Sequence, residues 1–320
     1  MPFLPMIKEL FEQYPPYHHL VASAQLVLAM FGMGIVTRPR DFVELVLEPK
    51  PMITGLLYQL AGIPLLTAAL VFFVELPPEV VVGFIMVAAM PGGSLSNIYT
   101  HLGRGNVALS VALTGLMTLL ALVTAPLIMR IFAGDHLPPE IAMPVGAVMR
   151  EIFLFLLLPL TAGMILGRVV KLQTAVLCSK WAVRASLIVL GVLVAGSLGS
   201  GSIDFSRYSA RIPLFVFLYC LIIQIIILRG ARHVLGFSSR DSMALGIESS
   251  MKNINLAVLI AASLFGIEGK NGEFGAGVLF VLLLYGGMSL GVAAVPAISN
   301  LRHLRKEEKA REAGSAGAGP

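Results

Sequence analysis

The sequence predicts an all-α polytopic membrane protein that crosses the bilayer about nine times. Its 320 residues are 57% hydrophobic and only 13% charged, with a mean hydropathy of +0.87. A soluble domain of this length needs far more polar residues to cover its surface. The apolar residues also fall into segments of about 16 to 26 residues, which as helices match the thickness of the hydrocarbon core. A lipid bilayer is therefore the expected environment.

About nine apolar segments follow one another along the chain, separated by charged or Pro- and Gly-containing loops. They cover residues 17–36, 52–74, 80–102, 107–132, 148–167, 186–203, 211–228, 242–265 and 275–298.

The loops between these segments alternate in charge. Lys and Arg occupy every second loop and the C-terminal tail, at Arg38, Arg40, Lys50, Arg104, Arg168, Lys171, Lys180, Arg184, Arg229, Arg232, Arg240 and residues 302–311. Because cytoplasmic loops carry the excess of basic residues, we expect a cytoplasmic C-terminus and an outer N-terminus in the plasma membrane. The net charge of +5 is thus a topology signal, and no nucleic-acid partner is expected.

Other signals are weak. Cys178 falls in a basic loop and Cys220 in an apolar segment, so no disulfide is expected between them. His18 and His19 have no carboxylate or cysteine cluster near them in the sequence, and we expect them at the outer membrane interface. Neither a cleaved signal peptide, nor a cofactor, nor a protein partner is expected.

Two apolar segments are interrupted by short polar clusters that each lead into Asn-Ile. Pro91-Gly-Gly-Ser-Leu-Ser-Asn97 divides the third segment, and Glu248-Ser-Ser-Met-Lys-Asn253 divides the eighth. Non-helical backbone is tolerated at membrane depth only where it lines a cavity or is buried in protein. Paired broken helices in two halves of a chain point to a transporter's binding site. We therefore interpret the chain as a carrier.

A weak internal repeat relates the two breaks. Aligning Asn97 with Asn253 also places Ser94 on Ser250. We expect an inverted repeat of two five-helix units, the first lacking its opening helix, with the two broken helices crossing. Both broken segments start from the outer side, so a parallel repeat stays open.

The polar groups at the breaks suit a sodium ion. Sodium is a hard cation that needs several oxygen ligands, which hydroxyls, amides, backbone carbonyls and a carboxylate supply. Ser96, Asn97 and Glu248 offer such groups at the breaks. Ser110 and Thr114 lie four residues apart on one face of the fourth helix, where close helix packing is the alternative role. An intramembrane carboxylate, in contrast, is functional by default.

These stretches resemble the bile acid:sodium symporter family. The resemblance is carried by Phe31-Gly-Met-Gly34, Pro91 to Asn97, Gly103-Arg-Gly-Asn-Val-Ala-Leu-Ser-Val111 and Glu248-x-x-Met-Lys-Asn253. It implies a core domain, residues 52–132 and 209–298, that moves against a panel domain, residues 1–36 and 141–204, followed by a cytoplasmic tail, residues 299–320. It also implies a first sodium site formed by Ser96, Asn97, Ser110, Thr114 and Glu248.

The second sodium site of the family departs from its pattern here. The resemblance places Gln59 and Met251 in this site, but Lys252 stands where the family usually has a glutamine. The Lys252 ammonium can reach the space between Gln59 and Glu248, and we expect it to take the place of the second sodium. Two alternatives stay open, namely a simple Glu248–Lys252 pair four residues apart and coupling to a proton through Lys252.

For the substrate we expect a polar cavity lined by Asn97, Asn253, Asn255, Tyr285 and Ser289. The N-terminal ends of the half-helices at the breaks favour an anionic group. Family members that bind bile salts often have a His-Asn pair in the ninth helix, where this chain has Gly286-Gly287. A small organic carboxylate therefore fits better than a bile acid.

Together these features predict a secondary active transporter that couples sodium to a small organic anion by alternating access. A proton-coupled or sodium-independent carrier is the alternative within this class. An intramembrane enzyme would rest only on Glu248 and Lys252 as an acid/base pair. A channel would need repeated filter elements around an axis, whereas this chain has two dissimilar breaks in one subunit.

Overall fold

A computed structural model describes residues 17–37, 49–138, 145–199, 208–265 and 272–316. In these ranges the regular elements are helices, and one isolated β-bridge joins two of the connecting segments. The helical elements are α2 (His18–Val36), α4 (Pro49–Leu57), η2 (Tyr58–Gly62), α5 (Ile63–Phe73), α6 (Pro78–Ala89), α7 (Ser94–Leu102), α8 (Val107–Ala133), η3 (Gly134–His136), α9 (Val145–Ile152), η4 (Phe153–Leu157), α10 (Leu158–Val169), α11 (Leu172–Gly199), α12 (Arg211–Arg229), η5 (Gly230–Val234), α13 (Ser239–Ser250), α14 (Ile254–Phe265) and α15 (Gly272–Ala316).

The all-α polytopic fold is confirmed. Within the described ranges, 7 helical runs are long and apolar enough to cross a membrane. The remaining two predicted segments are divided, with α6 and α7 on either side of the first break and α13 and α14 on either side of the second. The total of about nine crossings counts these divided segments as well and stays a prediction. Three of the long runs contain one π-helical turn each, at η2, η4 and η5.

The sixth predicted segment, residues 186–203, begins too late. Helix α11 starts at Leu172, so Cys178, Lys180 and Arg184 lie on a helix rather than in the expected loop. The stretch from 172 to 190 contains neither Gly nor Pro, and nothing in it ends a helix. Its charges are tolerated because the side chains are long, and the Arg184 guanidinium lies 5.3 Å from the Trp181 ring centroid.

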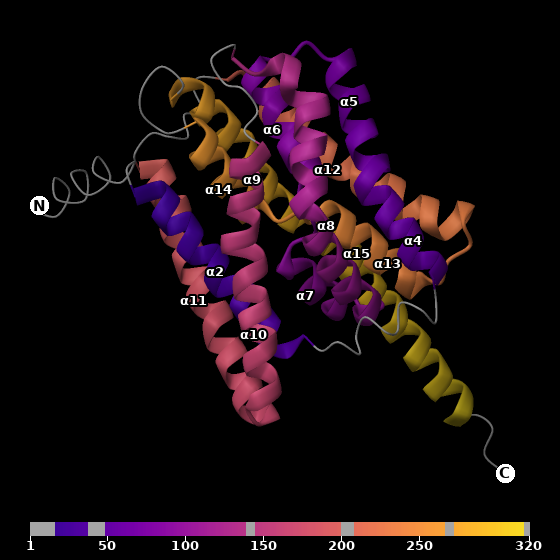
Figure 1. The fold of residues 1–320 in the computed structure, drawn as a ribbon. Helices are drawn as coiled ribbons and strands as arrows, with labels where there is room; N and C mark the ends of the chain where they lie inside the picture. The colour runs from indigo at the N-terminus through magenta and orange to yellow at the C-terminus, as the bar shows by residue number, and fades with distance from the viewer. Residues whose placement is uncertain (1–16, 38–48, 139–144, 200–207, 266–271, 317–320) are drawn as a thin grey trace, which may run out of the picture.

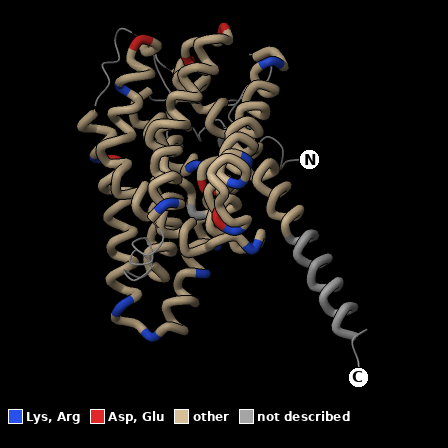
Figure 2. The backbone as a smooth tube through the Cα atoms, turned by 90° about the vertical axis from the view of Figure 1, so that its right-hand side faces the viewer, with Lys and Arg blue, Asp and Glu red and all other residues tan. Residues whose placement is uncertain are grey.

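Two groups of helices are visible in the packing. Helix α2 packs against both α10 and α11, and these three helices form the left side of Figure 1. The helices α6, α8, α12, α13 and α15 pack on one another in the remainder. Helix α14 contacts both groups, since it packs on α15 and also on α2. Among the described residues, the end of the molecule where α10 leads into α11 carries basic but no acidic residues in Figure 2, and the orientation of the protein in the membrane stays a prediction.

Candidate functional site

The two breaks meet inside the molecule. Gly92 and Lys252 form an antiparallel bridge between them. The Gly93 backbone N–H donates to the Met251 carbonyl at 2.8 Å, and the Asn253 N–H donates to the Pro91 carbonyl at 2.9 Å. Each break thus supplies hydrogen-bond partners for backbone groups that the other has released from helices. The broken segments cross where the sequence placed their interruptions.

Glycine is required at the first break by a close approach. A Cβ atom added to Gly92 would lie 1.8 Å from Glu248 Oε1, far inside van der Waals contact. The absence of a side chain at Gly92 therefore lets a carboxylate from α13 lie directly against the extended backbone between α6 and α7.

The Glu248 carboxylate is fully buried and surrounded by hydroxyl groups. Ser96 donates a short hydrogen bond to Oε2. Ser110 Oγ lies 3.0 Å from Oε2, and Thr114 Oγ1 lies 2.6 Å from Oε1. Asn97 joins the group, because its Oδ1 lies 2.8 Å from Ser110 Oγ. The structure therefore brings together all five residues predicted for the first sodium site.

This group contains more acceptors than protons. A hydroxyl has one proton to donate, yet Ser96 Oγ is also 2.6 Å from the Gly93 carbonyl, and Thr114 Oγ1 is 2.9 Å from the Ser110 carbonyl. The three hydroxyls face two carboxylate oxygens, an amide oxygen and two backbone carbonyls. A cation that is coordinated by oxygen would supply the missing positive charge. Hydroxyl, amide, carboxylate and carbonyl oxygens are the donors that a hard cation takes.

One further hydroxyl was missed by the sequence reasoning. Thr100 is buried on α7 and its Oγ1 lies 3.3 Å from Ser110 Oγ. Its position one turn after Ser96 on the same short helix could have indicated this, but no motif marks it.

The second region of the crossing has the opposite character. Lys252 is buried, and its Nζ donates to Gln59 Oε1 at 3.2 Å. Gln59 lies in the π-helical turn η2, and its Nε2 has no hydrogen-bond partner among the described residues. Met251 is buried beside them and contributes its carbonyl to the link between the breaks. Because α13 ends at Ser250, Glu248 and Lys252 do not share a helical face, and the described ion pairs do not include Lys252.

Two cavities lie between the crossing and the group formed by α2 and α11. The first has a volume of about 310 Å³ and is lined by Lys252, Asn253, Asn255 and Ser289, together with Gly286 and Gly287. The second, of about 320 Å³, is lined by Asn97 and Asn255, together with Gln25, Thr37, Ser179 and Ser186. Asn255 lies in the lining of both, so the two spaces adjoin at the start of α14.

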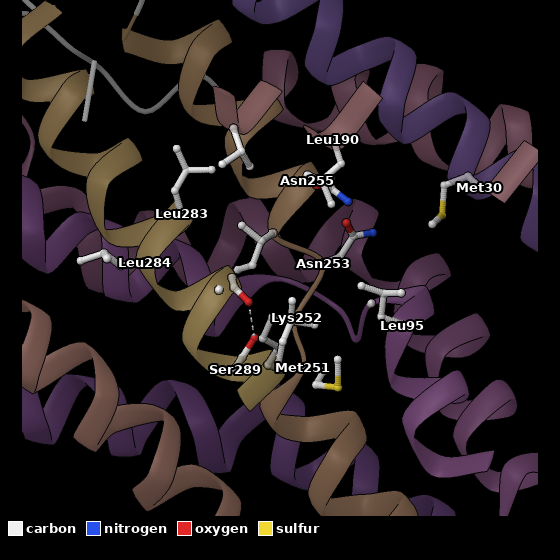
Figure 3. Close-up of a pocket in the computed structure, with 16 residues that line it drawn as sticks. Met30, Leu95, Leu190, Met251, Lys252, Asn253, Asn255, Leu283, Leu284 and Ser289 are labelled. Carbon is white, nitrogen blue, oxygen red and sulfur yellow. Dashed lines mark hydrogen bonds between the residues drawn. The ribbon is translucent and has the colours of Figure 1, made fainter. Parts of the chain in front are cut away.

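The walls of the first cavity are mainly apolar. Figure 3 shows Asn253 and Asn255 among the side chains of Leu95, Leu190 and Leu283. Asn253 also caps α14, since its Oδ1 accepts from the Leu256 N–H at 3.2 Å, while its Nδ2 has no partner in the described part of the chain. The space therefore offers amide groups at the crossing and hydrocarbon surfaces away from it.

Tyr285 differs from the other predicted lining residues. Its ring is fully buried, and its hydroxyl donates to the Ser250 carbonyl at 2.5 Å. It is absent from the lining of both cavities. The aromatic ring packs inward because the last carbonyl of α13 provides a partner for its hydroxyl there.

The expectation for His19 was incomplete. Its Nε2 lies 3.4 Å from Oε2 of Glu151, a buried carboxylate on α9. The two residues are far apart in the sequence, so this contact between α2 and α9 could not be found from spacing.

Comparison with known proteins agrees with the geometry. The profile of the Sodium Bile acid symporter family matches residues 24–201. The uncharacterized sodium-dependent transporter YocS of Bacillus subtilis (strain 168) is 34% identical over 252 residues, which cover 75% of this chain and 73% of that protein. The probable sodium/metabolite cotransporter BASS1, chloroplastic, of Arabidopsis thaliana is 30% identical over 250 residues, 75% of this chain and 59% of that one.

A shorter stretch of the chain is similar to an animal protein. The sodium/bile acid cotransporter 4 of Mus musculus is 30% identical over 193 residues, which cover 58% of this chain and 44% of the mouse protein. All three relatives carry the names of transporters rather than of enzymes. The family profile covers more than half of the chain. This multi-pass membrane protein is thus a transporter that belongs to the sodium bile acid symporter family.

Proposed function

We propose that this protein carries a small organic anion across the plasma membrane together with sodium, by alternating access. The N-terminus lies outside and the C-terminus in the cytoplasm. The acceptor-rich group around Glu248 carries the proposal, because five oxygen acceptors share the protons of three hydroxyls in a buried space. Sodium bound there neutralises the carboxylate.

One sodium ion accompanies each transport cycle. The Lys252 ammonium already contacts Gln59, the residue expected to bind a second sodium. A sodium ion about 4 Å from this ammonium would be repelled by roughly 4 kcal/mol at an effective dielectric constant near 20. It would also lack the amide oxygen that a glutamine at position 252 would offer. Lys252 therefore acts as a tethered cation in place of the second ion.

The moving parts are the predicted core and panel domains. The panel comprises residues 1–36 and 141–204, and the core comprises residues 52–132 and 209–298. Both cavities lie between α2 and α11 on the panel side and the broken helices on the core side, which supports this division. Movement of the core past the panel would expose the crossing to one side of the membrane and then to the other.

The substrate binds with its anionic group at the start of α14. The backbone N–H groups at a helix N-terminus favour negative charge, and Asn253 and Asn255 add amide donors there. The apolar walls formed by residues such as Leu190 and Leu283 accept a hydrocarbon body. The mouse relative is named for bile acids and the Arabidopsis relative for metabolites. A carboxylate with a compact apolar body fits the cavity of about 310 Å³.

Uptake into proteoliposomes tests this function. A panel of labelled organic carboxylates and bile acids is offered with a sodium gradient, a proton gradient, both or neither. We expect saturable uptake of a small carboxylate that requires the sodium gradient, with exchange accelerated by substrate on the opposite side. Uptake driven equally well without either gradient, or by protons alone, would replace the sodium proposal with the corresponding alternative carrier.

A further inference from the structure

We propose that Glu151 is a latch that holds one side of the transporter closed by joining α9 of the panel to α14 of the core. The inference rests on the proposed alternating-access function and adds to it a named contact that breaks in each cycle. Glu151 has no part in the sodium group or in the lining of either cavity.

The two half-helices that leave the crossing toward the panel, α14 and α7, pack against the panel to different extents. Helix α14 packs directly on α2, in the upper part of Figure 1. The cavity of about 320 Å³ lies between α7 and the pair α2 and α11, with Asn97 on one wall and the α2 residues from Gln25 to Val36, followed by Thr37, on the other; α7 makes only a small contact with α2. Helix α14 is therefore packed against α2 more extensively than α7 is, and we assign the closed side of the transporter to α14.

Glu151 lies where the closed side meets the panel. Its side chain is 3% exposed. Oε1 lies 3.3 Å from the Ser263 hydroxyl on α14, and Oε2 lies 3.4 Å from His19 Nε2 on α2. The Arg150 guanidinium, 3.7 Å from Oε1, is itself 69% exposed. The Glu151 carboxylate on α9, a helix that itself packs on α8 and α14, thus contacts both α14 and α2, although Oε2 accepts no hydrogen bond from the described residues.

A buried carboxylate stabilises only the arrangement that satisfies it. Taking a carboxylate out of water is costly unless partners replace the lost hydration. In the closed state Ser263 supplies one such partner from the core side. When α14 moves away, this hydrogen bond is lost and water can reach Glu151. The Glu151–Ser263 contact therefore biases the equilibrium toward the state that is closed on the α14 side.

The local helix geometry adds to this contact. The π-helical turn η4 starts at Phe153, directly after the end of α9, and the Phe155 ring packs edge-on against His19 with centroids 5.9 Å apart. A π-helical turn contains one extra residue, which rotates the following side chains about the helix axis. Such turns are frequent at functional positions. His19 is thus positioned from two sides beside the Glu151 carboxylate.

The test measures the two sides of the molecule separately. Spin labels are placed at exposed pairs that join panel to core, Leu20 with Phe73 on the α14 side and Leu172 with Leu102 on the α7 side. Cys178 and Cys220 are replaced by Ala, and distances are measured by pulsed electron paramagnetic resonance in lipid nanodiscs without substrate. Ser263→Ala removes only a hydroxyl and should leave the fold intact.

We expect Ser263→Ala and Glu151→Ala to lengthen the Leu20–Phe73 distance and shorten the Leu172–Leu102 distance together. The population of the state open on the α14 side should rise about tenfold, the scale of one hydrogen bond to a charged group. Thr161→Ala removes a hydroxyl whose described hydrogen bond runs to the Leu157 carbonyl, in the same continuous helical run, and should change neither distance.

Unchanged populations in both variants, or a broadening of both distances without opposite shifts, would overturn the latch. Uptake is measured after the same purified variants have been reconstituted into proteoliposomes. Opposite distance shifts in a protein that transports none of the organic anions would retain the latch and reject the proposed substrate class. Sodium-driven uptake with no distance shift would retain the proposed function and reject the latch.

Discussion

The two polar regions at the crossing differ in charge: one is short of positive charge, and the other already contains it. Around Glu248, the carboxylate, amide and carbonyl oxygens outnumber the protons of the three hydroxyls that face them. Around Lys252, an ammonium with three protons meets the amide oxygen of Gln59, and the amide nitrogen of Gln59 has no described partner. We propose that the first region binds a cation, whereas the second already contains the Lys252 ammonium. Under the proposed function, two neighbouring polar regions of one crossing therefore have opposite roles toward the same ion.

The largest effect is expected from substituting Gly92, because this change should disrupt the crossing that holds both polar regions. In Gly92→Ala the new Cβ would collide with Glu248 Oε1, so the carboxylate and the breaks cannot keep their arrangement. We expect sodium-driven uptake to fall at least about a hundredfold and the melting temperature to drop, because the collision disrupts a buried, charged group. Gly191→Ala, where a Cβ would meet nothing within 4 Å, is the matched control and should behave as the wild type.

Removing the charge of the first region should abolish coupling without unfolding the protein. Glu248→Gln keeps the size of the side chain but removes the negative charge that sodium is proposed to neutralise. We expect gradient-driven uptake to become undetectable while the melting temperature stays within a few degrees of the wild type. Glu79→Gln alters a carboxylate that accepts from Tyr208 away from the crossing and should retain uptake. Full sodium-driven activity in Glu248→Gln would rule out the proposed role.

A milder change weakens the first region. Thr114→Val removes the hydroxyl that lies 2.6 Å from Glu248 Oε1 and nearly preserves the side-chain volume. The sodium concentration for half-maximal uptake should rise about tenfold, the scale of one hydrogen-bonding or ligating oxygen beside a charge. Thr124→Val on the same helix removes a hydroxyl whose described hydrogen bond runs to the Leu120 carbonyl, and serves as the control. An equal effect of both changes would indicate that Thr114 serves helix packing.

The smallest effect is expected from substituting Lys252 in the second region. Lys252→Gln replaces the tethered cation by an amide, so that Gln59 can again contribute to a sodium site. The dependence of uptake on sodium should become steeper, with a Hill coefficient rising from about one toward two. Adding Gln59→Leu to Lys252→Gln should return the coefficient to about one. Lys180→Gln, on the exposed surface of α11, provides the control for loss of a positive charge.

The residues alone indicated Ser96, Asn97 and Glu248 as members of the first region, whereas the resemblance to the family was needed to add Ser110 and Thr114. Ser96 and Asn97 lie at a break, Glu248 is a carboxylate in an apolar segment, and Ser110 and Thr114 share a helical face. The collision that requires glycine at Gly92 could not be predicted, since it depends on how two distant breaks are stacked.

Other features were hidden for related reasons. Tyr285 turns inward to the Ser250 carbonyl, and Glu151 meets His19 across two helices; both contacts arise from tertiary packing. The helical start of α11 was missed because hydropathy detects the part of a helix inside the lipid and not its charged extension. Sequence patterns thus located the chemistry better than the contacts that support it.

The number of sodium ions bound by the purified protein tests the central claim most directly. Equilibrium binding of radioactive sodium to the wild type in detergent or nanodiscs, with Glu248→Gln as the blank, gives this stoichiometry without requiring the substrate. One ion bound per chain, lost in Glu248→Gln, is the result that the two opposite regions predict. Two ions bound cooperatively by the wild type would contradict it, because Lys252 would then leave the second site open.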